Sequence, residues 1–345
     1  MKVALITGIT GQDGAYLAKL LVEKDYKVFG LYRRTSSPNI WRLLSLGINN
    51  KVNLIPGDMT DMASINNAII QSEPDEIYNL AAQSFVGTSF EQPLATAMVD
   101  GLGVVGILES VKQMKRKIKV YHASTSELFG NGRGNIWGNK EALNEEDIFW
   151  PMSPYAAAKL YSYHTIRMYK EAYGIFAVNG VLFNHESPLR GLEFVTRKIT
   201  NSIARIKLGL QKQVVLGNLE AKRDWGYAPE YVEAIWLMLQ QDEPDDFVIA
   251  TGESHSVREF LEIACHYASL ESEKIVCQSD RFKRPLDINY LCGDGSKAKR
   301  ILGWTAMTKF EELVELMVEE DLKRWTNHLK GEIFPWDAIN DPGVY

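Results

Sequence analysis

Short apolar runs alternate with longer amphipathic segments along the first half of the chain. The runs with the length and apolar content of buried strands are residues 2–7, 27–32, 52–56, 76–80 and 118–123. Between them, segments such as 16–24 and 62–71 repeat their apolar positions with the period of a helix. This alternation predicts an α/β fold, in which a Rossmann-type doubly wound parallel sheet carries helices on both faces.

The pattern changes in the second half of the chain. Residues 153–173 predict one long helix and residues 176–182 a further strand. Beyond residue 183 the sequence has loops, short helices and scattered basic residues. We therefore expect a dinucleotide-binding Rossmann domain over residues 1–183 and a smaller C-terminal substrate domain over 184–345. A strand-like run at 246–250 predicts that part of the second half returns to the sheet.

Composition narrows the class of protein. The 345 residues are 46% apolar and 24% charged, which is ordinary for a soluble globular protein with a substantial core. The net charge of −6 argues against nucleic acid as a partner, so an anionic ligand would need local cations. The three cysteines lack metal-ligand spacing, which favours free thiols in a reducing compartment and predicts no metal site.

The N-terminal segment and the apolar runs suggest where the protein works. Residues 1–7 form a short apolar run followed at once by glycine, which is typical of a strand and not of a signal peptide. We expect no apolar run of the ~18 residues that cross a bilayer. The sequence therefore predicts a cytoplasmic protein that does not bind membranes.

A glycine-rich turn follows the first predicted strand. Gly8, Gly11 and Gly14 are spaced Gly-x-x-Gly-x-x-Gly, and Gln12 and Asp13 lie within the turn. Glycine permits close approach to a pyrophosphate, and the following helix directs its positive N-terminus to the same place. Between a strand and a helix, this pattern predicts a dinucleotide site, although a simple tight turn would use the same glycines.

The end of the second predicted strand indicates which dinucleotide binds. NAD would favour an acidic residue about 20 residues beyond the glycines, where it holds a ribose hydroxyl. This chain has Arg33 and Arg34, whose planar guanidinium groups suit a 2′-phosphate. We therefore expect NADP, unless both arginines are solvated or contact a neighbouring subunit. Further cofactor candidates follow the third and fourth strands: Asp58, Met59, Leu80, Ala82 and Ser84.

A tyrosine and a lysine are four residues apart in the predicted long helix. The spacing places Tyr155 and Lys159 on one helix face, where the ammonium group would lower the phenol pKa from its usual value near ~10. The resulting phenolate could accept a proton from a sugar or alcohol hydroxyl near neutral pH. The alternative to this catalytic role is that Tyr155 and Lys159 are ordinary solvent-exposed residues of an alanine-rich helix.

Two polar residues follow the fifth predicted strand. Ligands of parallel sheets bind beyond the carboxyl ends of the strands, so we expect Thr125 and Glu127 to meet the Tyr–Lys pair. Hydride transfer at a carbinol carbon needs a Ser or Thr beside this pair, but no additional carboxylate. Glu127 could therefore move a second proton; otherwise it is a helix-start carboxylate stabilised by exposed amides.

Taken together, these motifs resemble the extended short-chain dehydrogenase/reductases. The resemblance rests on the glycine-rich turn, the Tyr–Lys pair, and residues 79–86 and 123–127. Three later segments go beyond what a generic reductase needs and resemble the GDP-mannose 4,6-dehydratase family: residues 182–191, 194–198 and 216–226. The resemblance covers the chain from residue 1 to about residue 324.

This resemblance implies an internal redox cycle with NADP that converts GDP-mannose to a GDP-4-keto-6-deoxy sugar. Tyr155 would remove the O4 proton while hydride leaves C4. Glu127 would take the C5 proton, which the new keto group acidifies, and Thr125 would help water to leave from C6. Lys159 would hold the nicotinamide ribose.

Other residues match family positions around the two ligands. His185 and Arg190 match positions near the cofactor. The resemblance places a larger set around the GDP-sugar: Ser84, Ser126, Asn184, Val195, Lys198, Leu216, Asn218, Lys222, Arg223, Arg284 and Asp287. The lysines and arginines of this set could neutralise the charge of a diphosphate. An ordinary solvent-exposed surface, however, would contain the same types of residue.

Several positions depart from the family pattern. Met152 stands where the family usually has Arg, and Asp287 has a shorter side chain than the expected Glu. The loop at 130–147 is longer and richer in Gly and Asn, and residues 329–345 have no family counterpart. A related nucleotide sugar therefore stays open as the substrate.

Two other functions stay open on the sequence alone. A GDP-sugar 4-reductase or epimerase would use the same fold but would not need Glu127 as a C5 base. A non-catalytic nucleotide-binding protein would need none of the four reactive side chains. The resemblance also implies a homodimer or homotetramer, with helices near 101–113 and 153–173 at the interface. Residues 34–42 would reach a neighbour's cofactor.

Overall fold

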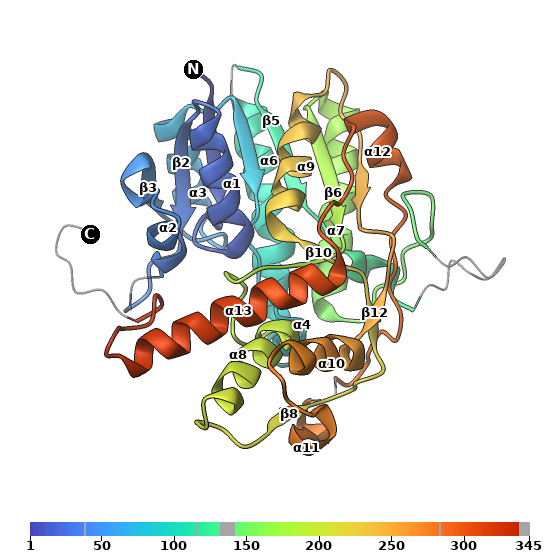
Figure 1. Ribbon diagram of the computed structural model, residues 1–345. Coiled ribbons are helices and arrows are strands. Elements are labelled where there is room, and N and C mark those ends of the chain that lie inside the picture. Colours follow the sequence, from blue (N-terminus) through green and yellow to red (C-terminus); the bar gives the residue numbers. More distant parts are fainter. Residues whose placement is uncertain (38, 115, 132–141, 283, 338–345) are drawn as a thin grey trace.

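A seven-stranded sheet forms the centre of this computed structural model, which describes residues 1–37, 39–114, 116–131, 142–282 and 284–337 (Figure 1). The strand order is β11-β6-β5-β4-β1-β2-β3, and neighbouring strands are parallel. The strands are β1 (Val3–Thr7), β2 (Lys27–Tyr32), β3 (Val52–Pro56), β4 (Glu76–Asn79), β5 (Lys119–Ala123), β6 (Ala177–Leu182) and β11 (Phe247–Ile249). The predicted Rossmann-type fold is confirmed, and β11 from the second half is an edge strand.

Helices cover both faces of the sheet and bury a core on each. The long helices are α1 (Gln12–Glu23), α3 (Met62–Ser72), α6 (Gly103–Gln113), α7 (Pro154–Tyr173) and α9 (Ala228–Gln240). Successive residues of a strand point to opposite faces. Ile6 of β1 therefore packs in the core that contains α1 and α9, whereas Leu5 packs in the core that contains α3, α6 and α7.

The second half of the chain builds a third core. It lies between α8 (Val195–Lys207), α10 (Val257–Tyr267) and α13 (Phe310–Leu329), with the strand pair β8 (Val214–Leu216) and β13 (Val276–Gln278). Ile199, Phe260 and Val314 are fully buried there. In Figure 1, α8, α10 and α11 gather beside the sheet, and α13 runs across toward α2.

The remaining elements are short. They are α2 (Trp41–Ser45), η1 (Asn49–Lys51), α4 (Val86–Glu91), α5 (Pro93–Ala97), η2 (Met98–Leu102), η3 (Ser126–Phe129), β7 (Asn184–Glu186), β9 (Lys222–Arg223), β10 (Trp225–Tyr227), β12 (His255–Ser256), α11 (Ser272–Ile275), η5 (Asp280–Phe282) and α12 (Ser296–Leu302). Parts of the long 130–147 loop and of the 329–345 tail, namely residues 132–141 and 338–345, lie outside the described residues.

Helix α7, which carries the Tyr–Lys pair, has strong local start and stop signals. Ser153 caps its N-terminus by accepting a hydrogen bond from the Ala156 amide at 3.1 Å, and Pro154 occupies the first turn. Gly174 ends the helix in the left-handed conformation with φ = 64°. These signals fix where Tyr155 lies relative to the sheet.

One stretch differs from the sequence prediction. The helical segment Pro93–Gln113 is long and apolar enough to cross a membrane, so the expectation that no such run exists is wrong. Within the fold, 56% of its most apolar window is buried. Its C-terminal part, α6, packs against α3 and α7, and a core helix of a soluble protein meets the same criteria.

Candidate active site

The glycine-rich turn has a backbone that requires small residues. Gly8 adopts φ = +70°, in the left-handed region. A Cβ on Gly14 would lie 2.3 Å from the carbonyl oxygen of Gly8, so only glycine lets α1 begin this close to the turn. Within the described chain, no side chain caps the N-terminus of α1, whose first amides are therefore available to an anion.

Gln12 and Asp13 connect this turn to β7. The Asp13 carboxylate lies 2.9 Å from His185 Nε2, and Gln12 donates to the His185 carbonyl at 3.1 Å. Burial opposes ionisation of Asp13, but the charge of His185 lowers the Asp13 pKa to about 2. Burial likewise opposes the charge on His185, but Asp13 outweighs it, and the His185 pKa is raised. The two side chains thus join the halves of the chain at the predicted cofactor site.

The other predicted cofactor residues lie at the carboxyl ends of β2, β3 and β4. Arg33 and Arg34 are exposed. The Thr60 amide lowers the pKa of Asp58, with a smaller contribution from Arg33. Met59 is buried against Gly103 of α6. Leu80 and Ala82 are half-buried and Ser84 is exposed.

Thr125, Glu127 and Tyr155 meet beyond the carboxyl end of β5. Thr125 caps η3, because its Oγ1 accepts a hydrogen bond from the Glu127 amide at 3.2 Å. The Tyr155 phenol is hydrogen-bonded to Thr125 and lies within reach of the charge of Glu127. Glu127 is 9% exposed and Tyr155 is 8% exposed. The fold therefore brings the predicted acid–base groups into one buried site.

The pKa of Tyr155 does not follow the sequence prediction. Burial raises it, the charges of Asp100 and Glu127 raise it further, and the hydrogen bond with Thr125 opposes them only in part. Lys159 Nζ donates to the Ala123 carbonyl at 2.8 Å and lies 6.0 Å from the centre of the Tyr155 ring. The expectation of a lowered phenol pKa is wrong for this structure because it considered Lys159 alone.

Asp100 is a buried carboxylate that the sequence analysis missed. It lies in the π-helical turn η2, is 0% exposed, and accepts a hydrogen bond from the Gln83 amide at 2.7 Å. Burial raises the pKa of Asp100 to about 6, with Lys159 opposing the shift. Asp100 in turn opposes the lowering of the Lys159 pKa by burial. The sequence signal that could have identified Asp100 was an acidic residue within an apolar helical stretch. In the structure this residue lies in a π-helical turn, and such turns are frequent at functional sites.

Glu127 also faces charged residues of the second half. Arg284 Nη1 lies 3.6 Å from Glu127 Oε1 and 4.0 Å from Asp287 Oδ1, and Arg223 Nη2 lies 3.6 Å from the same Asp287 oxygen. Burial lowers the pKa of Arg223, and Glu127 opposes this shift. The predicted C5 base and three predicted GDP-sugar residues therefore form one charged cluster.

The other predicted substrate residues occupy several elements. Lys198 of α8 places its ammonium 3.2 Å from the centre of the Phe282 ring, which joins α8 to η5. Leu216 is 1% exposed and packs in the third core. The rest are Ser126 in η3, Asn184 in β7, Val195 at the start of α8, Asn218 after β8 and Lys222 in β9.

Comparisons with known proteins identify the family of this chain. Residues 5–317 match the model of the family described as GDP-mannose 4,6 dehydratase. GDP-mannose 4,6 dehydratase 1 of Arabidopsis thaliana is 48% identical over 332 residues, which cover 93% of this chain and 90% of the relative. GDP-mannose 4,6 dehydratase of Homo sapiens is 47% identical, with 93% of this chain and 91% of the relative covered.

Solved structures share the fold. A UDP-glucose 4-epimerase of Thermotoga maritima has a TM-score of 0.81 at 23% identity and covers 94% of this chain and 99% of its own. A dTDP-glucose 4,6-dehydratase of Bacillus anthracis, in complex with NAD, has a TM-score of 0.81 at 19% identity, with 94% and 98% covered. At these identities the structures establish the fold, whereas the family model and the relatives at 47–48% identity establish the family. This chain belongs to the GDP-mannose 4,6-dehydratase family.

Proposed function

We propose that this protein dehydrates GDP-mannose to GDP-4-keto-6-deoxymannose. The observation that carries the proposal is the meeting of Tyr155, Thr125 and Glu127 in one buried site. Oxidation at C4 needs a base for a hydroxyl proton, which the ionised Tyr155 phenolate would supply. Loss of water across C5 and C6 needs a second base, which the Glu127 carboxylate supplies. A simple reductase or 4-epimerase has no use for that second base.

The cofactor that we propose is NADP. The residues fit a dinucleotide because Gly8 and Gly14 permit close backbone approach and the first turn of α1 has free amides. Arg33 and Arg34 at the end of β2 favour a 2′-phosphate over a ribose hydroxyl. A bound nicotinamide would accept hydride from the sugar C4 and return it at C6, so it is regenerated in each turnover.

The chain's own residues would manage the protons. Burial raises the pKa of Tyr155, so this phenol ionises only where positive charge is close. Lys159, whose Nζ lies 6.0 Å from the centre of the Tyr155 ring, would supply such charge, and Asp100 favours its protonated form. Glu127 would accept the C5 proton, and Thr125, already hydrogen-bonded to the phenol and to the Glu127 amide, would orient both groups.

Incubation of the purified protein with GDP-mannose tests this function. We expect a product lighter by one water, formed without net consumption of added NADPH. Tyr155→Phe, which keeps the ring and removes the hydroxyl, should give no product. In a parallel reaction with added NADP, stoichiometric formation of NADPH without loss of water would instead identify a GDP-sugar 4-reductase acting in reverse.

The identity of the sugar and of the cofactor needs separate measurements. Met152 and Asp287 depart from the family pattern, so other GDP-linked and nucleotide-linked hexoses belong in the same assay. Mass spectrometry of the nucleotide released on denaturation distinguishes NADP from NAD. Recovery of NAD would contradict the role that we propose for Arg33 and Arg34.

We further propose a cytoplasmic homo-oligomer. Apolar side chains are exposed on the helices around η2 and α7: Leu94 (79% exposed), Met98 (46%), Leu102 (58%) and Tyr161 (51%). A partner subunit would cover them. Among the described residues, no disulfide joins Cys265, Cys277 or Cys292, which suits a reducing compartment.

A further inference from the structure

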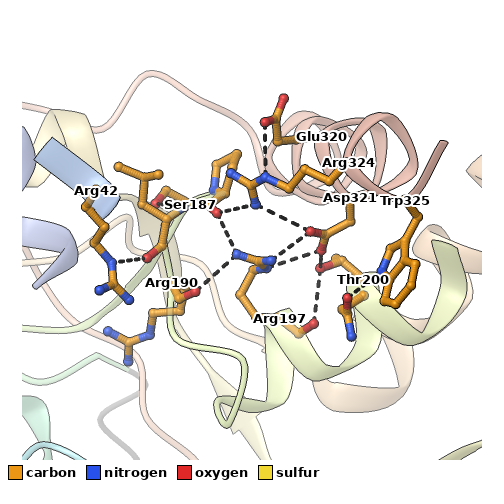
Figure 2. A network of polar contacts seen from close by, with 12 residues as sticks. Arg42, Ser187, Arg190, Arg197, Thr200, Glu320, Asp321, Arg324 and Trp325 are labelled. Atoms are coloured by element: carbon orange, nitrogen blue, oxygen red, sulfur yellow. Dashed lines mark hydrogen bonds and ion pairs between the residues drawn. The ribbon is translucent and has the colours of Figure 1, made fainter. Parts of the chain in front are cut away.

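Three consecutive carbonyl oxygens after β7 are each held by an arginine. Pro188 O accepts hydrogen bonds from Arg197 at 2.5 Å and from Arg324 at 2.7 Å. Leu189 O accepts from Arg42 at 2.7 Å, and Arg190 O accepts from Arg197 at 3.1 Å. Figure 2 shows these guanidinium groups converging on this segment, which we call the 187–190 turn.

The three arginines come from distant parts of the chain. Arg42 belongs to α2 beside the sheet, Arg197 to α8 and Arg324 to α13. Arg197 is fully buried and forms a bidentate pair with Asp321, at 2.7 Å and 3.2 Å. Thr200 donates to the same carboxylate at 2.7 Å. We call Arg42, Arg197 and Arg324 the arginine clasp.

The arginine clasp also contacts the predicted cofactor site. Arg42 donates a second hydrogen bond, at 3.0 Å, to the carbonyl of Thr10 in the glycine-rich turn. Ser187 donates to Gln12 of α1 at 2.7 Å. The charge of Arg190, at the end of the 187–190 turn, acts on both Asp13 and His185. The Arg42 guanidinium group therefore bridges the glycine-rich turn and the 187–190 turn.

Stability alone does not explain such an arrangement. A buried ion pair such as Arg197–Asp321 contributes little net stability, because desolvation offsets the attraction. A forked guanidinium group does, however, fix the positions of two acceptors at once. We propose that the arginine clasp positions the 187–190 turn against the glycine-rich turn and thereby slows release of the dinucleotide. The inference rests on the proposed function for the identity of that ligand.

The decisive variant is Arg42→Gln, because residue 42 is only half-buried, whereas Arg197 is fully buried and paired with Asp321. The measurement is the release rate of NADPH from the loaded full-length protein, followed by fluorescence. Loss of two hydrogen bonds from a charged donor should speed release roughly tenfold or more. The affinity for GDP, measured by calorimetry, should stay unchanged. Arg42→Lys keeps the charge and one donor and should recover part of the effect.

Two further variants separate positioning from general damage. Arg324→Gln removes one of the two donors to Pro188 O and should speed release by a smaller factor. Combined with Arg42→Gln, its effect should be less than the product of the single effects, because both act on one turn. Arg205→Gln is the matched control on α8, since its guanidinium lies over the Trp325 ring, 5.1 Å from its centre.

The outcomes distinguish the clasp from the proposed function. Equal NADPH release from wild type and Arg42→Gln would overturn the clasp, even in an active dehydratase. Parallel losses of GDP affinity, thermal stability and NADPH retention would also overturn it, because they indicate a structural role only. Faster release with intact GDP binding supports the clasp, whether or not GDP-mannose is dehydrated.

Discussion

At the scale of single residues, buried charges determine the chemistry of the site. Burial raises the pKa of Tyr155 and of Asp100 and lowers that of Lys159, so each charge depends on its neighbours. The charge of Asp100 opposes the lowering of the Lys159 pKa, and Lys159 Nζ lies 6.0 Å from the centre of the Tyr155 ring. The pKa of Tyr155 therefore depends on several groups and not on Lys159 alone.

The first prediction concerns Glu127→Gln. The amide cannot accept the C5 proton, so we expect dehydration to fall by roughly 10²–10⁴-fold. Oxidation at C4 should still occur, because Tyr155 is unchanged, and NADPH absorbance should rise to a plateau with GDP-mannose. The readouts are this absorbance and the mass of the sugar nucleotide. Glu91→Gln, at an exposed position in α4, is the control. Full turnover by Glu127→Gln would contradict the assignment.

The second prediction is a pH dependence from the Asp13–His185 pair. The lowered Asp13 pKa adds stability that is present above the unfolded value and is lost as pH falls toward about 2. The raised His185 pKa adds stability below about pH 6.5, lost as pH rises through the folded value. The pair should thus stabilise the fold most between about pH 4 and 6.5.

Asp13→Asn removes this contribution. We expect its unfolding free energy to lie about 1–2 kcal/mol below that of wild type near pH 5–6, with the gap narrowing toward pH 9. Urea titrations of both proteins across that range provide the measurement. Asp242→Asn, at an exposed position, should follow wild type. A gap that does not change with pH would exclude an ionic contribution.

At the scale of elements, short irregular segments place the reactive groups. The 3₁₀ turn η3 directs Glu127 back toward Thr125, and the π-helical turn η2 buries Asp100 near α7. The glycine-rich turn brings the start of α1 against Gly8. Regular helices and strands set the framework, whereas these turns give each side chain its final direction.

The third prediction tests the glycine-rich turn. Gly14→Ala would place a Cβ 2.3 Å from the Gly8 carbonyl oxygen, so either α1 or the turn must shift. We expect a loss of about 1–3 kcal/mol in unfolding free energy and weaker dinucleotide binding. Thermal melts and NADPH titration measure the two effects. Gly101→Ala is the control, because its Cβ would make an ordinary 3.4 Å contact with Tyr161. Wild-type behaviour of Gly14→Ala would refute the steric argument.

At the scale of the whole molecule, the site forms between two parts of the fold. The segment after β5 supplies Thr125 and Glu127 and helix α7 supplies Tyr155, whereas Arg223 and Arg284 come from the smaller region of the second half. The arginine clasp and the Asp13–His185 contact join the same two parts. These contacts hold the two parts together beside the candidate site.

The fourth prediction concerns assembly. Leu102 is 58% exposed on η2, and we expect a partner subunit to cover it. Leu102→Asp would bury a charge in that contact and should raise the subunit dissociation constant at least tenfold. Light scattering or sedimentation across protein concentrations provides the readout. Leu329→Asp, at a 56% exposed position on α13, is the control. A wild-type protein that stays monomeric at all concentrations would rule the interface out.

The sequence by itself determined the features that depend on neighbours along the chain. Apolar periodicity predicted the strands of the sheet and the helices that cover it. Helices and strands repeat their buried positions with different periods, and these periods are visible in the sequence. The spacing of Tyr155 and Lys159 placed both on one helix face for the same reason. The glycine spacing predicted the turn because it is a local backbone requirement.

Only the tertiary structure decided which distant groups meet and how far water is excluded from them. Asp13 and His185 are 172 positions apart, and Asp100 is near Lys159 only because η2 packs on α7. Arg284 meets Glu127 across the site in the same way. The shift of the Tyr155 pKa could not be predicted from the sequence. It depends on desolvation and on the charges of Asp100 and Glu127, and sequence spacing encodes neither.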